Sequence, residues 1–93
     1  MSPESFIGTI SEFAGHWTPR NWMPCDGRLL PVGNNQYTAL FSIVGTTYGG
    51  DGVKNFALPD LRPSDAHGNK VDWRYTSQPM VCICINGVYP SRD

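Results

Sequence analysis

The chain has 93 residues, of which 40% are apolar, 12% aromatic and 16% charged, and its formal net charge is −1. This length allows one small domain, close to the size at which a single core is barely sufficient. A charge near zero provides no field to attract nucleic acid or acidic lipid, so neither partner is expected. The longest apolar run, Met80–Ile85, is far shorter than the ~20 residues that span a bilayer, so no membrane insertion is expected. Residues 1–5 lack the basic and apolar regions of a signal peptide, and none is expected.

The N-terminal part of the chain predicts a strand followed by a loop. Residues 6–13 alternate imperfectly between apolar and polar side chains and predict an opening strand. Glycine and proline interrupt Ala14–Pro24, which is expected to be a loop carrying Trp17 and Trp22. For Trp22 we favour a place in the core over stacking on a sugar ring.

Asp26-Gly27 is a strong turn signal, because glycine reaches positive φ without a steric cost. We expect this turn to link Met23–Cys25 to Arg28–Pro31 as a hairpin or a tight corner.

One helix is expected, at about residues 35–45. Asn34 or Asn35 can cap its N-terminus, and Gly45 fits the left-handed position that ends many helices. Its apolar face follows the spacing i, i+3, i+4 and i+7. The residues on that face are Tyr37, Leu40, Phe41 and Val44.

Residues 48–55 form a glycine-rich loop that follows the helix and leads into an expected strand, Phe56–Leu58. A phosphate-binding loop needs the opposite order, strand then glycines then helix N-terminus, so we interpret this segment as a structural turn. Asp60 and Arg62 are interpreted as local hydrogen-bonding partners for a second turn rather than as a catalytic site.

Residues 63–78 are the most polar and variable segment, and residues 79–90 form a closing apolar strand. The strand is apolar on both alternating faces at first, which is typical of a strand covered by the core or by another subunit. Because Tyr, Trp and Arg are enriched in binding hot spots, the polar segment holds the candidate receptor or partner contacts. These are His67, Lys70, Trp73, Arg74 and Tyr75. For Trp73 two interpretations stay open: an exposed contact, or a ring that closes over the domain edge or docks a neighbouring subunit.

The three cysteines are Cys25, Cys82 and Cys84, and an odd number cannot pair completely within one chain. Cys82 and Cys84 lie two apart on the expected strand and therefore share a face. We favour buried thiols that act as small apolar side chains. A disulfide from Cys25 to one of the pair, or a disulfide between subunits, is the alternative.

Signals for catalysis or a metal are weak. His16 and His67 are available for a Ser-His-Asp set, but no Gly-x-Ser-x-Gly turn presents a nucleophile. The cysteines lack the Cys-x-x-Cys spacing of a zinc site, although a metal shared between subunits through either histidine stays open. The aspartates lie in turn-like contexts, where the carboxylate normally bonds its own backbone. We therefore expect no enzyme activity, no cofactor and no metal.

Three blocks of unusual composition occur in fixed order. They read Trp22-Met-Pro-Cys-Asp-Gly-Arg-Leu-Leu30, Leu40-Phe-Ser-Ile-Val-Gly-Thr-Thr-Tyr-Gly-Gly-Asp-Gly52 and Asn55-Phe-Ala-Leu-Pro-Asp-Leu-Arg62. Together these blocks resemble the phage tail-collar domain family. The matching family pattern is W-x-x-C-D-G-x-x-L, then L-F-x-x-x-G-T-x-Y-G-G-D-G, then F-x-L-P-D-L-R. Larger relatives carry a long glycine-rich insertion after the third block, and this chain is a short form that lacks it.

The resemblance implies a virion component, assembled in the host cytoplasm into the tail of a phage or a phage-like injection particle. It also implies a homotrimer whose further partners are tail, fibre or baseplate proteins. A baseplate or fibre-attachment role is favoured because the distal insertion is missing. The alternative is a receptor-binding tip that recognises a host surface glycan or protein through residues 63–77, with a metal-binding or hydrolytic protein as the third possibility. The expected fold is α+β, a small β-rich single domain over residues 1–93 with one short helix.

Overall fold

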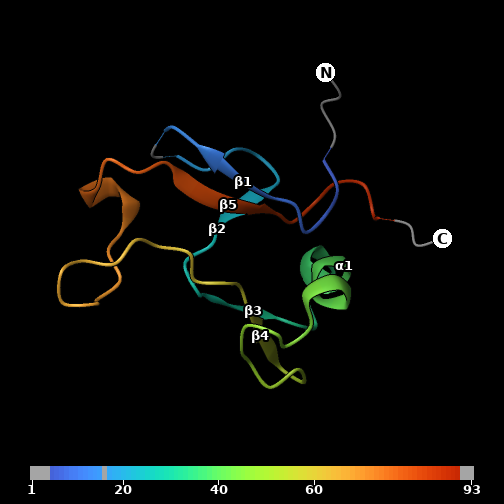
Figure 1. The fold of residues 1–93 in the computed structure, drawn as a ribbon. Helices are drawn as coiled ribbons and strands as arrows, with labels where there is room; N and C mark the ends of the chain where they lie inside the picture. The colour runs from blue at the N-terminus through green and yellow to red at the C-terminus, as the bar shows by residue number, and fades with distance from the viewer. Residues whose placement is uncertain (1–4, 16, 91–93) are drawn as a thin grey trace.

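The computed structural model describes residues 5–15 and 17–90. In this part of the chain the elements, in order, are β1 (Ile10–Phe13), β2 (Trp22–Pro24), β3 (Leu29–Pro31), α1 (Asn35–Val44), β4 (Asn55–Ala57), the 3-10 helix η1 (Trp73–Tyr75) and β5 (Met80–Cys84). Short strands with one α-helix make a small α+β domain (Figure 1), which confirms the expected fold class.

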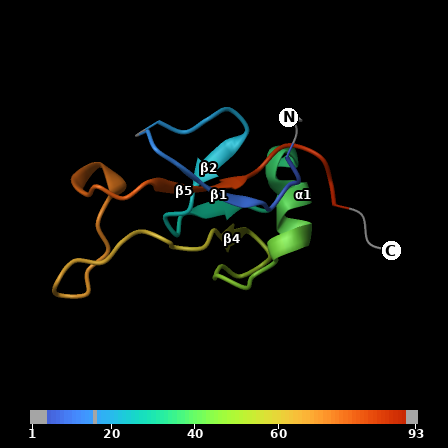
Figure 2. The ribbon, with the colours of Figure 1, turned by 45° about the horizontal axis from the view of Figure 1, so that its top comes forward.

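The last strand organises the larger sheet. β5 lies between β1 and β2 in a three-stranded antiparallel sheet, with Ile10 opposite Ile83 and Trp22 opposite Cys84. β3 and β4 form a separate two-stranded antiparallel sheet. The two sheets lie in separate layers, with α1 at one end of the molecule and the loop before η1 at the other (Figures 1 and 2). The three-stranded sheet is therefore complete only when β5, the last strand, inserts between β1 and β2.

β5 is buried on both faces because each face covers a different core. Successive side chains of a strand point to opposite sides. Ile83 packs into the main cluster, while Met80 and Cys82 pack into a second cluster with Trp73. The cover over both faces of β5 thus comes from the domain itself rather than from another subunit.

The main core joins α1 to both sheets. Its fully buried members are Cys25, Leu40, Phe56, Leu58 and Ile83, each at most 1% exposed. Leu40 lies at the centre of the predicted helix face, and the other three residues of that face pack against the same cluster. The side chain of Asn34 caps α1 by accepting the N–H of Gln36 at 2.8 Å. At the other end the N–H of Gly45, at φ +55°, donates to the carbonyl of Phe41 at 2.8 Å, so both predicted helix ends are confirmed.

The second core is small and rich in aromatic side chains. Trp73, Met80 and Cys82 are its buried members, and Phe13 and Trp22 pack against them. The rings of Phe13 and Trp22 meet edge to face, with centroids 5.2 Å apart and an interplanar angle of 76°. Trp22 is thus a packing residue, as favoured from the sequence.

Three predicted boundaries need correction. The closing strand, expected over residues 79–90, spans only Met80–Cys84, because the chain leaves the sheet and bends at residues 86–87. The opening strand is shorter than residues 6–13, because the N–H of Thr9 donates to the carbonyl of Phe6 at 3.1 Å and forms a turn before β1. Phe6 makes only an isolated bridge, to Val88. The expected loop 14–24 ends earlier than predicted, since Trp22 already belongs to β2.

The Asp26-Gly27 turn is a corner and not a hairpin. β2 pairs with β5 and β3 pairs with β4, so the turn passes the chain from one sheet to the other. The glycine-rich loop is a structural turn, as predicted. Its Asp51 carboxylate accepts the backbone N–H groups of Val53, Lys54 and Asn55 at 2.9, 2.8 and 3.2 Å.

Candidate functional site

Three Asp-x-Arg segments adopt the same local structure. Each carboxylate accepts two hydrogen bonds from the arginine two residues later, one from Nε and one from Nη2. The distances are 3.0 and 2.8 Å for Asp26 and Arg28, 2.9 and 2.8 Å for Asp60 and Arg62, and 3.4 and 3.4 Å for Asp72 and Arg74. We call each pair a fork.

The backbone explains why each fork closes on itself. In every fork the carboxylate also accepts the backbone N–H of its arginine, at 3.2, 3.3 and 2.9 Å in chain order. This is the turn that aspartate favours through its own side chain. It places the arginine side chain beside the carboxylate, where a two-bond pairing is geometrically matched.

The first two forks lie side by side. Asp26 and Asp60 face each other in an isolated antiparallel bridge, and the N–H of Leu61 donates to the carbonyl of Cys25 at 2.8 Å. Gly27 permits the close approach, since a β-carbon there would lie 3.1 Å from that of Asp60, and its φ of +79° favours glycine.

All three forks border one pocket of about 240 Å³. Its lining residues are Pro24, Asp26, Arg28, Arg62, Asp72, Trp73, Arg74 and Met80. We call this hollow the three-fork pocket. The corner after β2 supplies one side of it, the segment after β4 another, and the start of η1 the third.

The charges in the pocket hold one another in their ionised forms. Hydrogen bonds from Arg28 and Arg62 keep the pKa values of Asp26 and Asp60 below their usual 3.8. The pKa of Asp72 is lowered first by the backbone N–H of Arg74 and then by its side chain. Asp60 raises the pKa of Arg62 most, and the carboxylates of Asp26 and Asp72 add to the rise. Arg62 therefore lies within the field of all three carboxylates.

The sequence identified only one of these forks in advance, Asp60 with Arg62. A signal for the others was present, because the pattern Asp-x-Arg occurs three times in the chain. Their convergence could not be inferred, since it depends on how the corner after β2 and the segment after β4 pack together.

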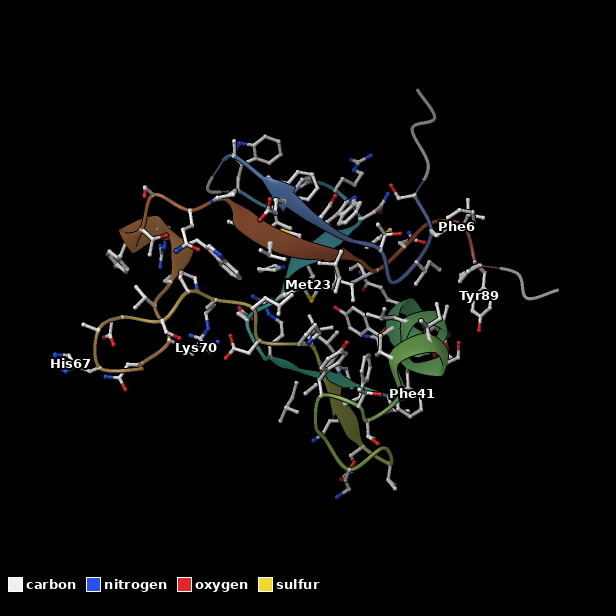
Figure 3. The ribbon with its side chains drawn as sticks, in the orientation of Figure 1. Phe6, Met23, Phe41, His67, Lys70 and Tyr89 are labelled. Carbon is white, nitrogen blue, oxygen red and sulfur yellow. The ribbon has the colours of Figure 1, made fainter. Side chains whose placement is uncertain are left out.

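The five predicted contact residues have different environments. His67 is exposed near the tip of the loop before η1, and Lys70 lies on the same loop (Figure 3). The ammonium of Lys70 donates to the carbonyl of Arg62 at 3.1 Å, which ties the loop to the second fork. Tyr75 is 77% exposed, and the guanidinium of Arg74 stacks over its ring at 5.8 Å from the centroid.

Trp73 differs from the exposed contact that was one of its two interpretations. Its side chain is 3% exposed and belongs to the second core, so its ring closes over the domain edge. In this conformation it is not a free-standing surface contact, and it can be reached only as part of the wall of the three-fork pocket.

The cysteines are buried free thiols. Cys25, Cys82 and Cys84 are each at most 1% exposed, and no disulfide joins them. Burial raises the pKa of the Cys25 thiol to about 12, with Cys82 and Asp26 adding to the rise, and burial also raises the pKa of the other two thiols. This environment matches the favoured interpretation of small apolar packing residues.

Within residues 5–15 and 17–90, no group of three or more His, Cys, Asp or Glu side chains is placed to hold a metal ion. His16, one of the two histidines considered for a shared metal, lies outside the described residues. No helix in the described part of the chain is long and apolar enough to cross a membrane.

Comparison with known proteins assigns the family. The model of the Phage Tail Collar Domain matches residues 8–64, which is more than half of the chain. The chain belongs to the phage tail collar domain family. No curated protein and no solved structure matched it.

Membership of the collar family indicates a structural component of the phage tail, associated with other tail proteins. The matched span holds the first two forks, whereas Asp72 and Arg74 follow it in the C-terminal segment. The three-fork pocket is thus built partly from the span that the collar model matches and partly from the residues that follow it.

Proposed function

We propose that this collar domain is a non-enzymatic attachment module that assembles as a homo-oligomer, a trimer by analogy with its family, at a baseplate or a fibre root. The observation that carries the proposal is an apolar surface formed by α1 and by the described residues nearest to each terminus. Its members are Phe6, Ile43, Val88 and Tyr89, which are 56%, 38%, 39% and 53% exposed. We call it the terminal apolar surface.

Specific contacts hold this surface together. Phe6 pairs with Val88 in a parallel bridge, and the hydroxyls of Tyr89 and Ser42 lie 2.6 Å apart. Figure 3 shows Phe6 and Tyr89 at the end of the molecule where α1 lies. An apolar surface built from ordered segments suits burial against a second copy, since large exposed apolar patches on soluble proteins commonly mark interaction sites.

The oligomer can be tested by placing a charge on this surface. We expect light scattering after gel filtration to give a trimer mass for the native chain and a monomer mass for Val88→Asp, because a buried unpaired carboxylate is strongly unfavourable. Val53→Asp is the matched control, since Val53 is 78% exposed in the glycine-rich loop. It should keep the trimer.

Two results would contradict the proposal. A monomer mass for the native chain would contradict the homo-oligomer. An unchanged mass for Val88→Asp would contradict the terminal apolar surface as its interface. Labelled antibody on intact particles would then test the location, with label at the baseplate or fibre root expected.

A second candidate function is a receptor-binding tip. It is favoured by η1 and the loop before it, which lie at the opposite end of the molecule from α1 (Figure 1). The loop exposes His67, and η1 exposes Arg74 and Tyr75. The tip hypothesis predicts that alanine at these three positions reduces adsorption of particles to host cells. Trp73 is kept native because its burial would confuse loss of binding with loss of folding. Unchanged adsorption, or label away from the free end of a fibre, would reject the tip.

A further inference from the structure

The three-fork pocket has more hydrogen-bond donors than the protein uses. A guanidinium carries five N–H donors, and each fork occupies one on Nε and one on Nη2. Among residues 5–15 and 17–90, three donors of each arginine have no protein acceptor and are left for water or a ligand. The forks fix the planes of Arg28, Arg62 and Arg74. The side-chain entropy that a ligand would otherwise lose by ordering these donors is therefore largely lost before the ligand binds.

The remaining acceptors and apolar groups are also specific. Each fork carboxylate already accepts three hydrogen bonds, two from the side chain and one from the backbone of its arginine. It keeps some lone-pair capacity for a hydroxyl donor. Pro24, Trp73 and Met80 contribute apolar wall. The pocket therefore combines fixed cationic donors, a few acceptors and a carbon surface.

Charge decides what kind of anion fits. Three arginines against the two aspartates of the lining leave one positive charge, and the adjacent Asp60 and Lys70 cancel each other. A singly charged carboxylate balances this pocket, whereas a phosphate monoester brings up to two negative charges. The volume of about 240 Å³ is below the ~300–1,000 Å³ of pockets for drug-sized ligands, so it suits a single small ring.

We propose that the three-fork pocket binds one acidic sugar residue, a pyranose that carries a carboxylate. The carboxylate lies against the guanidinium ends, the ring hydroxyls donate to the fork carboxylates, and the C–H face packs on the apolar wall. An acidic side chain of a partner protein is the competing occupant. It supplies a carboxylate but no hydroxyls, and would leave the acceptors without partners.

This inference goes beyond a structural role in the tail and does not depend on the terminal apolar surface. It gives the receptor-binding hypothesis a ligand class. Its failure would leave the oligomer proposal unchanged, because the two are measured on different surfaces and by different observables.

The test is a nuclear magnetic resonance titration of the full chain with sodium galacturonate, galactose and acetate. We expect galacturonate to shift the Nε–H signals of Arg28, Arg62 and Arg74 and the indole N–H of Trp73. Galactose and acetate should bind at least about tenfold more weakly. Equal binding of acetate would overturn the proposal in favour of a socket for a protein carboxylate. Equal binding of galactose, or no shift with galacturonate, would overturn it as well.

A single substitution tests whether galacturonate binds in the three-fork pocket. Arg74→Gln removes the most exposed guanidinium, at 62% side-chain exposure, from the fork with the longest bonds. The fold should therefore persist, as its amide spectrum would show. We expect galacturonate affinity to fall by about tenfold or more, whereas Arg20→Gln, at an exposed arginine outside the pocket, should leave it unchanged. Unchanged affinity in Arg74→Gln would overturn the assignment.

Discussion

Asp26 and Asp60 lie opposite each other in an isolated bridge, and each holds the guanidinium of the arginine two residues later. Two like charges are therefore brought together with their own counter-charges already in place. This arrangement lets the corner after β2 pack against the segment after β4 without leaving a carboxylate unpaired.

The forks predict a loss of stability in acid. The folded-state pKa values of Asp26 and Asp60 lie below the usual 3.8, so these carboxylates stabilise the fold above the unfolded pKa. That contribution is lost as the pH falls through the lowered values. We expect the free energy of unfolding, measured in denaturant, to be level above about pH 5 and to fall below about pH 4. Asp26→Asn should reduce this dependence of stability on pH. A carbon resonance of the Asp26 carboxyl group that gave a pKa above 3.8 would contradict the prediction.

The thiols are expected to be unreactive in the folded protein. All three are buried with raised pKa values, and only the thiolate attacks a disulfide reagent. Ellman's reagent at pH 8 should find no accessible thiol in the native chain and three in denaturant. Finding a single thiol in denaturant would instead show a disulfide within the chain.

Raised thiol pKa values also predict an alkaline limit to stability. The contribution of Cys25 is fully present below the unfolded thiol pKa near 9.0 and is lost as the pH rises toward about 12. Cys25→Ala should reduce this decline in the free energy of unfolding, and the thiols of Cys82 and Cys84, whose pKa values burial also raises, should account for a remainder. An identical alkaline profile in the variant would show that another group is responsible.

Gly27→Ala should loosen the contact between the first two forks. The substitution strains a φ of +79° and places a methyl group 3.1 Å from the β-carbon of Asp60. We expect a loss of about 1–3 kcal/mol in the free energy of unfolding. Gly33→Ala is the matched control, since nothing lies within 4 Å of a β-carbon there. Equal stability of the two variants would refute the close approach.

Leu40→Ala should be among the most damaging single truncations in the helix. Leu40 is 0% exposed at the centre of the main core, so the change leaves a cavity and costs about 2–5 kcal/mol. Gln36, on the same helix, is exposed and lies outside the terminal apolar surface, so Gln36→Ala should cost less than about 1 kcal/mol. Thermal and denaturant unfolding would measure both variants. Similar losses of stability would contradict the assignment of the buried face of the helix.

The sequence by itself determined the local structure that short-range chemistry controls. The helix, its Asn34 cap and its apolar face follow from spacing and from one side-chain hydrogen bond. The turn at Asp51 and the pairing of Asp60 with Arg62 likewise join residues at most four positions apart. The family followed from three blocks of unusual composition, which the family model matches over residues 8–64.

Only the tertiary structure decided which distant segments meet. The sequence could not show that β5 inserts between β1 and β2, because strand pairing depends on contacts across nearly the whole chain. Trp73 stands in a polar segment and is nevertheless 3% exposed, since β5 brings Met80 and Cys82 against it. The three forks are each local, yet their convergence on one pocket depends on that same long-range packing. Hydrogen bonds between near neighbours can be inferred from residue order, whereas burial and convergence are properties of the whole folded chain.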